Sequence, residues 1–228
     1  MNYYQLKSES DPKIIGVKNG VHQGEIKWEK FNNQKTHGII EEYFSLGKYR
    51  KNVDSIEPYD FQIDYVEAYK SAKMTDFFSF TPRLWGIDFF LSTNVKLLLE
   101  TFNLPTKAFI PAFIYHKGIQ YQYWALYIPV SYREDSVNFK KSIFFEKIGL
   151  LQSKQILFDN VNEYLNNRFV HAQKITLNNL FDKKLDLFTT LFNGYGYYLS
   201  EGLKKAIEKN NFTGIKIKEP LNPEILID

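Results

Sequence analysis

The sequence predicts an α+β protein with short, mostly antiparallel strands and Ser-capped amphipathic helices packed against them. Two observations lead to this prediction. Runs rich in β-branched and aromatic residues surround a tight Lys-Gly turn, and two other such runs each lead into a serine followed by a helical pattern. We expect one continuous domain over residues 1–228, with a variable N-terminal portion at about residues 1–74.

The N-terminal portion begins with a predicted hairpin. Asn19-Gly20 lies between short β-branched runs within residues 13–26, and this dipeptide is the strongest short-range signal for a two-residue turn. Residues 31–69 are polar, acidic and rich in aromatic side chains, and their pattern does not decide between helix and strand. Pro82 and Gly86 indicate a loop before the first clear element.

That element is a short strand that leads into a helix. The strand covers residues 87–92, and Ser92 is placed as the N-cap of the helix, which Pro105 ends. Its apolar residues recur at helical spacing; they are Val95, Leu98, Leu99 and Phe102.

Further strands are expected after this helix. Residues 108–115 and 121–129 predict two antiparallel strands around the turn at Lys117-Gly118. Shorter strands are expected at residues 142–147 and 155–158.

The C-terminal block repeats the earlier strand and helix. Residues 198–212 align with residues 90–104 without a gap, and five of these fifteen positions are identical. The identical pairs are Leu91/Leu199, Ser92/Ser200, Lys96/Lys204, Glu100/Glu208 and Asn103/Asn211. Two explanations fit: an internal duplication, or two unrelated Ser-capped helices that each follow a strand.

Composition narrows the classes of protein. Of the 228 residues, 44% are hydrophobic and 24% are charged, as in ordinary globular proteins. The 29 basic and 26 acidic residues are mixed without a dense basic tract, so nucleic acid is not an expected partner. Cysteine is absent, which excludes disulfides and thiolate metal sites. With no secretion signal and no apolar run near the roughly 18 residues of a membrane span, we expect a cytoplasmic protein with no membrane partner.

No familiar catalytic or metal-binding motif is present. The histidines lie far apart, and no two of them stand at the helical spacing of common metal motifs; they are His22, His37, His116 and His171. The glycine-rich segment at residues 193–202 departs from the nucleotide-binding fingerprint, because its third glycine comes six residues after the second. We therefore expect no metal, no cofactor and no enzymatic activity.

The acidic stretch supplies the candidate site. Asp60 and Asp64 are four residues apart and would share one face of a helix, as would Asp64 and Glu67. Together with Tyr65 and Tyr69, these carboxylates would form a charged and aromatic surface suited to a basic protein partner. We nominate these five residues as partner-binding residues.

Two other functions remain open on the sequence. Asp60 and Asp64 could be the paired carboxylates of an enzyme acting on a carbohydrate or a nucleotide, provided that burial raises the pKa of one of them. Alternatively, exposed Trp85, Trp124 and tyrosine rings could form a glycan- or peptide-binding module.

Several segments follow the order of motifs in a known family. Tyr198-Leu-Ser-Glu-Gly-Leu-Lys-Lys-Ala-Ile-Glu-Lys-Asn-Asn-Phe-Thr-Gly-Ile-Lys-Ile217 is a strand, a Ser-capped helix, a Thr-Gly pair and a final strand. Upstream come Thr75-Asp-Phe-Phe78, Phe90-Leu-Ser92 and Phe109-Ile-Pro111. Over roughly residues 75–219 the chain resembles the bacterial immunity proteins of polymorphic toxin systems of the imm-eleven type. One departure is Phe78, where that family has an aliphatic residue.

The resemblance implies a cytoplasmic, non-enzymatic inhibitor. Its partner would be a cognate toxin domain, which it would neutralise by occlusion. An interface of standard size, about 1,600 Å² in total, can cover an active site without any chemistry of its own. The resemblance implies no particular binding residues.

Overall fold

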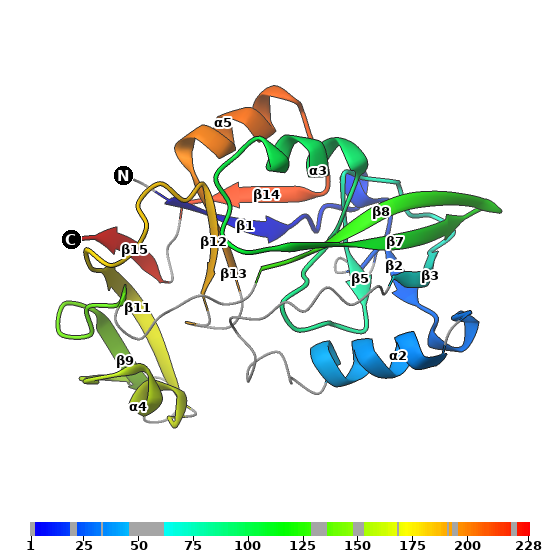
Figure 1. The fold of residues 1–228 in the computed structure, drawn as a ribbon. Coiled ribbons are helices and arrows are strands. Elements are labelled where there is room, and N and C mark those ends of the chain that lie inside the picture. The colour runs from blue at the N-terminus through cyan, green and yellow to red at the C-terminus, as the bar shows by residue number, and fades with distance from the viewer. Residues whose placement is uncertain are drawn as a thin grey trace.

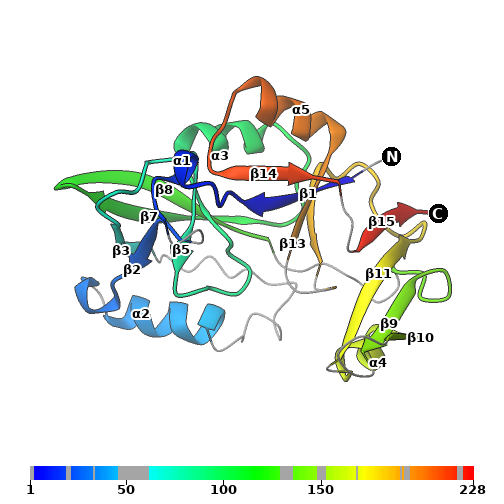
Figure 2. The same ribbon diagram turned by 180° about the vertical axis from the view of Figure 1, so that it is seen from behind.

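The computed structural model describes residues 3–18, 22–32, 34–45, 62–128, 136–147, 153–167, 169–190, 192, 196–219 and 223–228. Within these residues the chain is a mixed α and β structure dominated by three sheets, in agreement with the predicted α+β class. Most neighbouring strands run antiparallel, and the described parallel pairs are β2–β5, β3–β7 and β11–β15. Helices α3 and α5 lie side by side on one side of the molecule, and α2 lies on the opposite side (Figures 1 and 2).

The largest described sheet has seven strands in the order β4-β6-β8-β7-β3-β2-β5. Their bounds in this order are Phe77–Phe78, Phe90–Leu91, Ile119–Tyr127, Ala108–His116, Ile63–Ala68, Gly24–Ile26 and Phe80–Thr81. The long β7–β8 hairpin confirms the two strands predicted around Lys117-Gly118. Both turn residues have positive φ, at 52° and 81°, as a two-residue turn between twisted strands requires.

The second described sheet joins the two ends of the chain. Its order is β12-β13-β1-β14, and the strands are Leu187–Thr190, Gly196–Ser200, Tyr3–Ser8 and Ile215–Lys218. The N-terminal strand β1 thus lies between two C-terminal strands, with Tyr3 opposite Ser200 and Ser8 opposite Ile215.

The third described sheet has the order β10-β9-β11-β15. These strands are Ser153–Ile156, Ile143–Lys147, Val170–Leu177 and Glu224–Ile227. Strand β9 matches the strand predicted at residues 142–147, and β10 begins two residues before the one predicted at 155–158.

The helices are short. They are α1 Pro12–Ile15, the 3-10 helix η1 Trp28–Lys30, α2 Gln34–Ile40 with its π-helical continuation η2 Glu41–Ser45, α3 Thr93–Glu100, α4 Val161–Leu165 and α5 Glu201–Lys209. No helix in the described ranges is long and apolar enough to cross a membrane.

Helix α1 shows that the predicted N-terminal hairpin is wrong. Asp11 caps this helix by accepting a hydrogen bond from the N–H of Lys13 at 2.8 Å, and Pro12 occupies its first turn. These start signals prevail over the β-branched residues that follow. Strand β2, which corresponds to the second strand of the predicted hairpin, pairs with β3 and β5. The predicted turn residues Asn19 and Gly20 lie outside the described residues.

The sequence similarity around Ser92 and Ser200 is also a structural repeat. The order β4-β6-β8-β7 in the first sheet corresponds to β12-β13-β1-β14 in the second. The registers agree as well, since Phe77 lies opposite Leu91 and Leu187 lies opposite Leu199. We call residues 75–127 the first repeat, and residues 185–218 together with β1 the second repeat.

Side-chain contacts repeat along with the strands. The third and seventh residues after each serine are buried, namely Val95 and Leu99 in α3 and Leu203 and Ile207 in α5. The ammonium group of Lys96 lies 4.8 Å from the ring centre of Trp124, and that of Lys204 lies 4.1 Å from the ring centre of Tyr4. One hydrophobic core contains the buried residues of both helices, so the two repeats pack as one unit.

Each repeat has an aspartate that binds the start of its own helix. The carboxylate of Asp76 accepts a hydrogen bond from the Ser92 hydroxyl at 3.0 Å, and that of Asp186 accepts one from the Ser200 hydroxyl at 2.6 Å. Each serine oxygen in turn accepts from the backbone N–H three residues later, at 3.4 and 3.2 Å. These bonds satisfy donors that a helix leaves free in its first turn.

The second oxygen of each aspartate reaches the other repeat. Asp76 accepts a hydrogen bond from the N–H of Thr213, just after α5, at 3.0 Å. Asp186 accepts one from the N–H of Asn103, just after α3, also at 3.0 Å. Each of these reciprocal aspartates therefore connects the start of its own helix to the segment that follows the other helix.

The Thr-Gly pair after α5 has a geometric explanation. Gly214 has a φ of +91°, and a Cβ atom there would lie 2.1 Å from the carbonyl oxygen of Phe77. Only glycine allows this approach of two backbones. The close approach places the Thr213 hydroxyl 3.0 Å from the Asp76 carboxylate, where it donates a second hydrogen bond.

Candidate functional site

The nominated residues do not form a helix face. Asp60 lies outside the described residues, while Asp64, Tyr65 and Glu67 belong to strand β3 and Tyr69 follows it. Pairing with β2 and β7 on either side fixes this segment as a strand. Because side chains alternate along a strand, residues 64 and 67 point to opposite sides, and the helical interpretation of their spacing is wrong.

The side chain of Asp64 is buried and hydrogen-bonded. Its exposed fraction is 6%, and its two oxygens accept hydrogen bonds from the N–H of Asn32 at 2.9 Å and the amide of Gln62 at 2.8 Å. These bonds hold the segment after η1 against β3. The Asp64 carboxylate therefore contributes to the fold and not to a surface for a partner.

Tyr65, Glu67 and Tyr69 share the other side of β3. The Tyr65 ring stacks on that of Tyr115, with 4.1 Å between the ring centres and 10° between their planes. The Lys30 ammonium lies 4.3 Å from the centre of the Tyr65 ring and 3.7 Å from the Glu67 carboxylate. We call these five partly or largely exposed residues the aromatic face.

A shallow hollow of about 580 Å³ adjoins the aromatic face. Its charged and aromatic lining consists of Glu25, Lys27, Glu67, Tyr69, Lys70 and Lys117. Glu25 and Lys27 pair at 2.6 Å. The surface that the sequence predicted to be acidic therefore carries both signs of charge.

A second hollow, of about 480 Å³, lies between the two repeats. We call it the inter-repeat cleft. Strand β1 and Gly196 contribute from the second repeat, and the segment between β5 and β6 contributes from the first. Its ionisable lining residues are Lys7, Glu9, His22, Arg83 and Asp88, and its apolar ones include Leu6, Phe80 and Ile87.

Asp88 is the least satisfied charge in this cleft. Its side chain is 21% exposed, and the nearest cation is the Arg83 guanidinium, whose Nη2 lies 4.0 Å from Oδ1. No residue within the described ranges donates a hydrogen bond to this carboxylate. Burial raises the pKa of Asp88 to about 6, although Arg83 and Lys7 act in the opposite direction.

The other ionisable groups of the cleft differ from Asp88. Burial lowers the pKa of both Lys7 and His22. For Glu9, burial favours the neutral form, but hydrogen bonds from Lys216 and from two backbone N–H groups lower its pKa overall. Glu9 is thus a satisfied ion that joins the end of β1 to β14.

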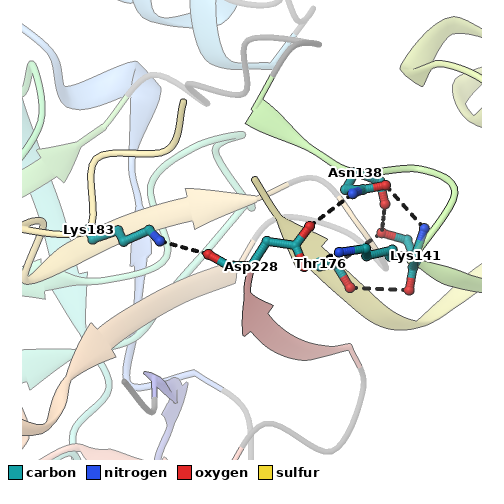
Figure 3. Close-up of polar contacts among 6 residues, drawn as sticks. Asn138, Lys141, Thr176, Lys183 and Asp228 are labelled. Carbon is teal, nitrogen blue, oxygen red and sulfur yellow. Dashed lines mark hydrogen bonds and ion pairs between the residues drawn. The ribbon is translucent and has the colours of Figure 1, made fainter. Parts of the chain in front are cut away.

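Another polar cluster surrounds Asp228 (Figure 3). Its carboxylate accepts hydrogen bonds from Lys141 at 2.7 Å and Asn138 at 2.9 Å, which lower its pKa. Its main-chain oxygen accepts from Lys183 at 2.7 Å, and the Thr176 hydroxyl donates to the carbonyl of Lys141 at 3.1 Å. The cluster fixes the end of β15 beside β11, which is a structural role.

The tryptophans considered for glycan binding lie apart from each other. The Arg83 guanidinium carbon is 5.2 Å from the ring centre of Trp85, and Lys96 lies over Trp124. The Trp124 indole also donates to the Thr93 hydroxyl at 3.3 Å. Among the described residues, no group of three or more potential ligands is placed to hold a metal ion.

Comparison of the chain with protein-family models finds no match, and comparison with curated proteins finds none either.

The inter-repeat cleft was not predicted from the sequence. Lys7, Arg83 and Asp88 belong to segments that only the strand pairing brings together. One signal was available in the sequence: extending the gapless alignment four residues upstream of the serines places Gly196 opposite Asp88. The first repeat therefore has a charged residue where the second repeat has glycine, so the fold shared by the repeats does not require a charge at this position.

Proposed function

We propose that the protein is an immunity protein of the imm-eleven type that binds a cognate bacterial toxin domain and neutralises it by occlusion, without catalysis. One observation supports this proposal most directly: the segments that carry the family resemblance converge in the network of the reciprocal aspartates. Asp76 accepts hydrogen bonds from Ser92 and Thr213, Asp186 accepts one from Ser200, and Gly214 permits the contact between Thr213 and Asp76. The resembling residues are thus those on which a common fold depends.

The aromatic face is the proposed binding surface. The stack of Tyr65 on Tyr115 fixes two large rings before binding, which reduces the entropy lost when a partner orders them. Glu67 and Lys30 beside the rings supply both signs of charge for orienting the partner. Tyrosine is one of the residue types enriched at the energetic centres of protein interfaces, where the partner covers its ring.

Co-expression with any toxin domain encoded beside this gene tests the proposal. We expect growth to be restored, the two proteins to co-purify, and the toxin to be inhibited at one to one stoichiometry and recovered with unchanged mass. Inhibition at substoichiometric amounts, or a covalently altered toxin, would indicate an enzyme. Absence of both rescue and binding would refute the immunity function.

Variants of the aromatic face locate the surface. Tyr65→Ala and Glu67→Lys should each weaken toxin binding roughly tenfold or more. The matched control is Lys205→Gln on α5, an exposed charge whose loss should leave the dissociation constant unchanged. Equal affinity of all three variants and the wild type would place the binding surface elsewhere.

A further inference from the structure

The repeat provides an internal reference for the inter-repeat cleft. Counted from Ser92 and Ser200, Asp88 corresponds to Gly196, and both residues line the cleft. Gly196 is the first residue of β13 and lies opposite Thr190, whereas Asp88 lies two residues before β6 and in none of the described strands. Because no described residue donates a hydrogen bond to the Asp88 carboxylate, this side chain takes no part in the hydrogen bonds that hold its repeat together.

The same comparison applies to Lys7. The registers of β1 on β13 and of β8 on β6 make Lys7 the counterpart of Tyr127. Tyr127 is 5% exposed, and its ring packs against that of Phe44 with centres 5.1 Å apart. The first repeat uses this position for the core, whereas the second presents an ammonium group to the cleft.

The charges of the cleft form an ordered pattern. Asp88, with its side chain 21% exposed, is an acceptor to which no residue in the described part of the chain donates. Arg83, with its side chain 57% exposed, lies nearer to the solvent, and its 4.0 Å distance from Asp88 exceeds hydrogen-bond length. Glu9 forms an ion pair with Lys216, so it adds no unpaired charge to the cleft.

We propose that the inter-repeat cleft binds a small zwitterion of amino-acid type. The ammonium group of the ligand donates to the Asp88 carboxylate, its carboxylate lies against Arg83 and Lys7, and its side chain lies over the apolar lining at Leu6 and Phe80. The volume of about 480 Å³ is within the roughly 300–1,000 Å³ of small-molecule sites.

Ligands with a single charge fit this pattern less well. An anion would leave Asp88 without donors and add a like charge beside it, and a cation would be repelled by Arg83 and Lys7. An ammonium donor also supplies the charge-assisted hydrogen bond that this carboxylate lacks. Its raised pKa, caused by burial, agrees with an acceptor that has no partner in the free protein.

Titration of the full-length ¹⁵N-labelled protein with each of the twenty L-amino acids, one at a time, tests the proposal. The readout is the pair of backbone amides of Phe89 and Gly196, which line the cleft. At least one amino acid should give saturable shifts at both amides. Acetate and methylamine, at the same concentrations, should give none.

Variants of the charged residues test whether these residues bind the amino acid. Asp88→Asn and Arg83→Gln should each weaken the binding of that amino acid roughly tenfold or more. The Lys205→Gln variant, changed on α5 at a residue that does not line the cleft, should bind this amino acid as the wild type does. A folded Asp88→Asn variant with unchanged affinity overturns the proposal.

Two further outcomes overturn it. One is the absence of saturable shifts with all twenty amino acids. The other is an equal effect of acetate alone, which would make the cleft a simple anion site. Neither outcome bears on the proposed immunity function, which depends on the aromatic face.

Discussion

Asp88 and Glu9 lie in one cleft and differ in the hydrogen bonds that they receive. Glu9, whose side chain is 5% exposed, receives hydrogen bonds from Lys216, Ser10 and Asp11. Asp88 receives none from any described residue. A buried ion that is fully bonded stabilises the folded state, whereas one without donors destabilises it.

We predict that Asp88→Asn stabilises the protein at neutral pH. Burial raises the pKa of Asp88 to about 6, above the roughly 3.9 of an unfolded chain, so the folded state binds the proton more tightly. The corresponding stabilisation is complete below about pH 4 and is lost as the pH rises through 6. Urea unfolding should show a gain of about 1–3 kcal/mol at pH 7.5 and almost none at pH 4. An equal effect at both pH values would contradict this assignment.

Glu9→Gln is the matched variant and should act with the opposite sign. Because the pKa of Glu9 is lowered in the folded state, its ionised form stabilises the protein above the unfolded pKa of roughly 4.3. The free energy of unfolding at pH 7 should fall by about 1–3 kcal/mol. This loss should shrink as the pH falls below 4 and the wild-type carboxylate is protonated.

At the scale of elements, α3 and α5 depend on each other. Helices of eight and nine residues are too short to be stable alone, and their stability comes from packing and from bonded ends. The reciprocal aspartates connect the start of each helix to the segment after the other. Loosening one helix should therefore disturb both.

We predict that Asp76→Ala lowers the free energy of unfolding by about 2–3 kcal/mol, since hydrogen bonds to a charged acceptor are lost. Hydrogen exchange should quicken at the start of α3 and also at Thr213 after α5. Glu208→Ala, on the exposed side of α5, is the control and should change stability by roughly 0.5 kcal/mol or less. Faster exchange in α3 alone would show that the two helices are not coupled in this way.

At the scale of the whole molecule, the N-terminal strand completes the second repeat. The equivalent strand of the first repeat, β8, follows β7 directly in the chain, whereas β1 pairs with β13 and β14 from the other end. Strand β1 also places Tyr3 and Leu6 in two of the hydrophobic cores. The second repeat therefore cannot form from the C-terminal segment alone.

We predict that deletion of residues 1–8 unfolds the second repeat and spares the β7–β8 hairpin. Hydrogen exchange should show lost protection in β13 and β14 and retained protection in β7 and β8. A synthetic peptide of residues 1–10 should restore protection in β13 and β14, because it supplies the missing central strand. Full protection of β13 and β14 without the peptide would disprove this dependence.

Local patterns predicted the elements whose partners are close in the chain. The β7–β8 hairpin follows from Lys117-Gly118 between two β-rich runs, and the buried positions of α3 follow from the spacing of Val95 and Leu99. In α1, Asp11 before Pro12 is a helix-start signal, and it decides the local structure despite the Asn-Gly dipeptide downstream.

Distant pairing could not be predicted in the same way. A spacing of three or four residues between carboxylates fits a helix, yet Asp64 and Glu67 are held in a strand by β2 and β7. Local patterns say even less about the inter-repeat cleft, because its lining residues Lys7 and Arg83 are far apart in the sequence and come together only in the folded protein. Its charged residues Lys7 and Asp88 differ from Tyr127 and Gly196 at the equivalent positions of the other repeat, and only the strand registers establish the equivalence of Lys7 and Tyr127.

The position of β1 also sets an order of folding during synthesis. All strands of the first repeat lie within residues 77–127, so they can pair while the ribosome is still adding the rest of the chain. Strand β1 is synthesised before these strands, but Tyr3 must wait for Ser200 and Ser8 must wait for Ile215. Until then β1, which carries the core residues Tyr3 and Leu6, stays unpaired on the nascent chain, where it is open to chaperones and to aggregation.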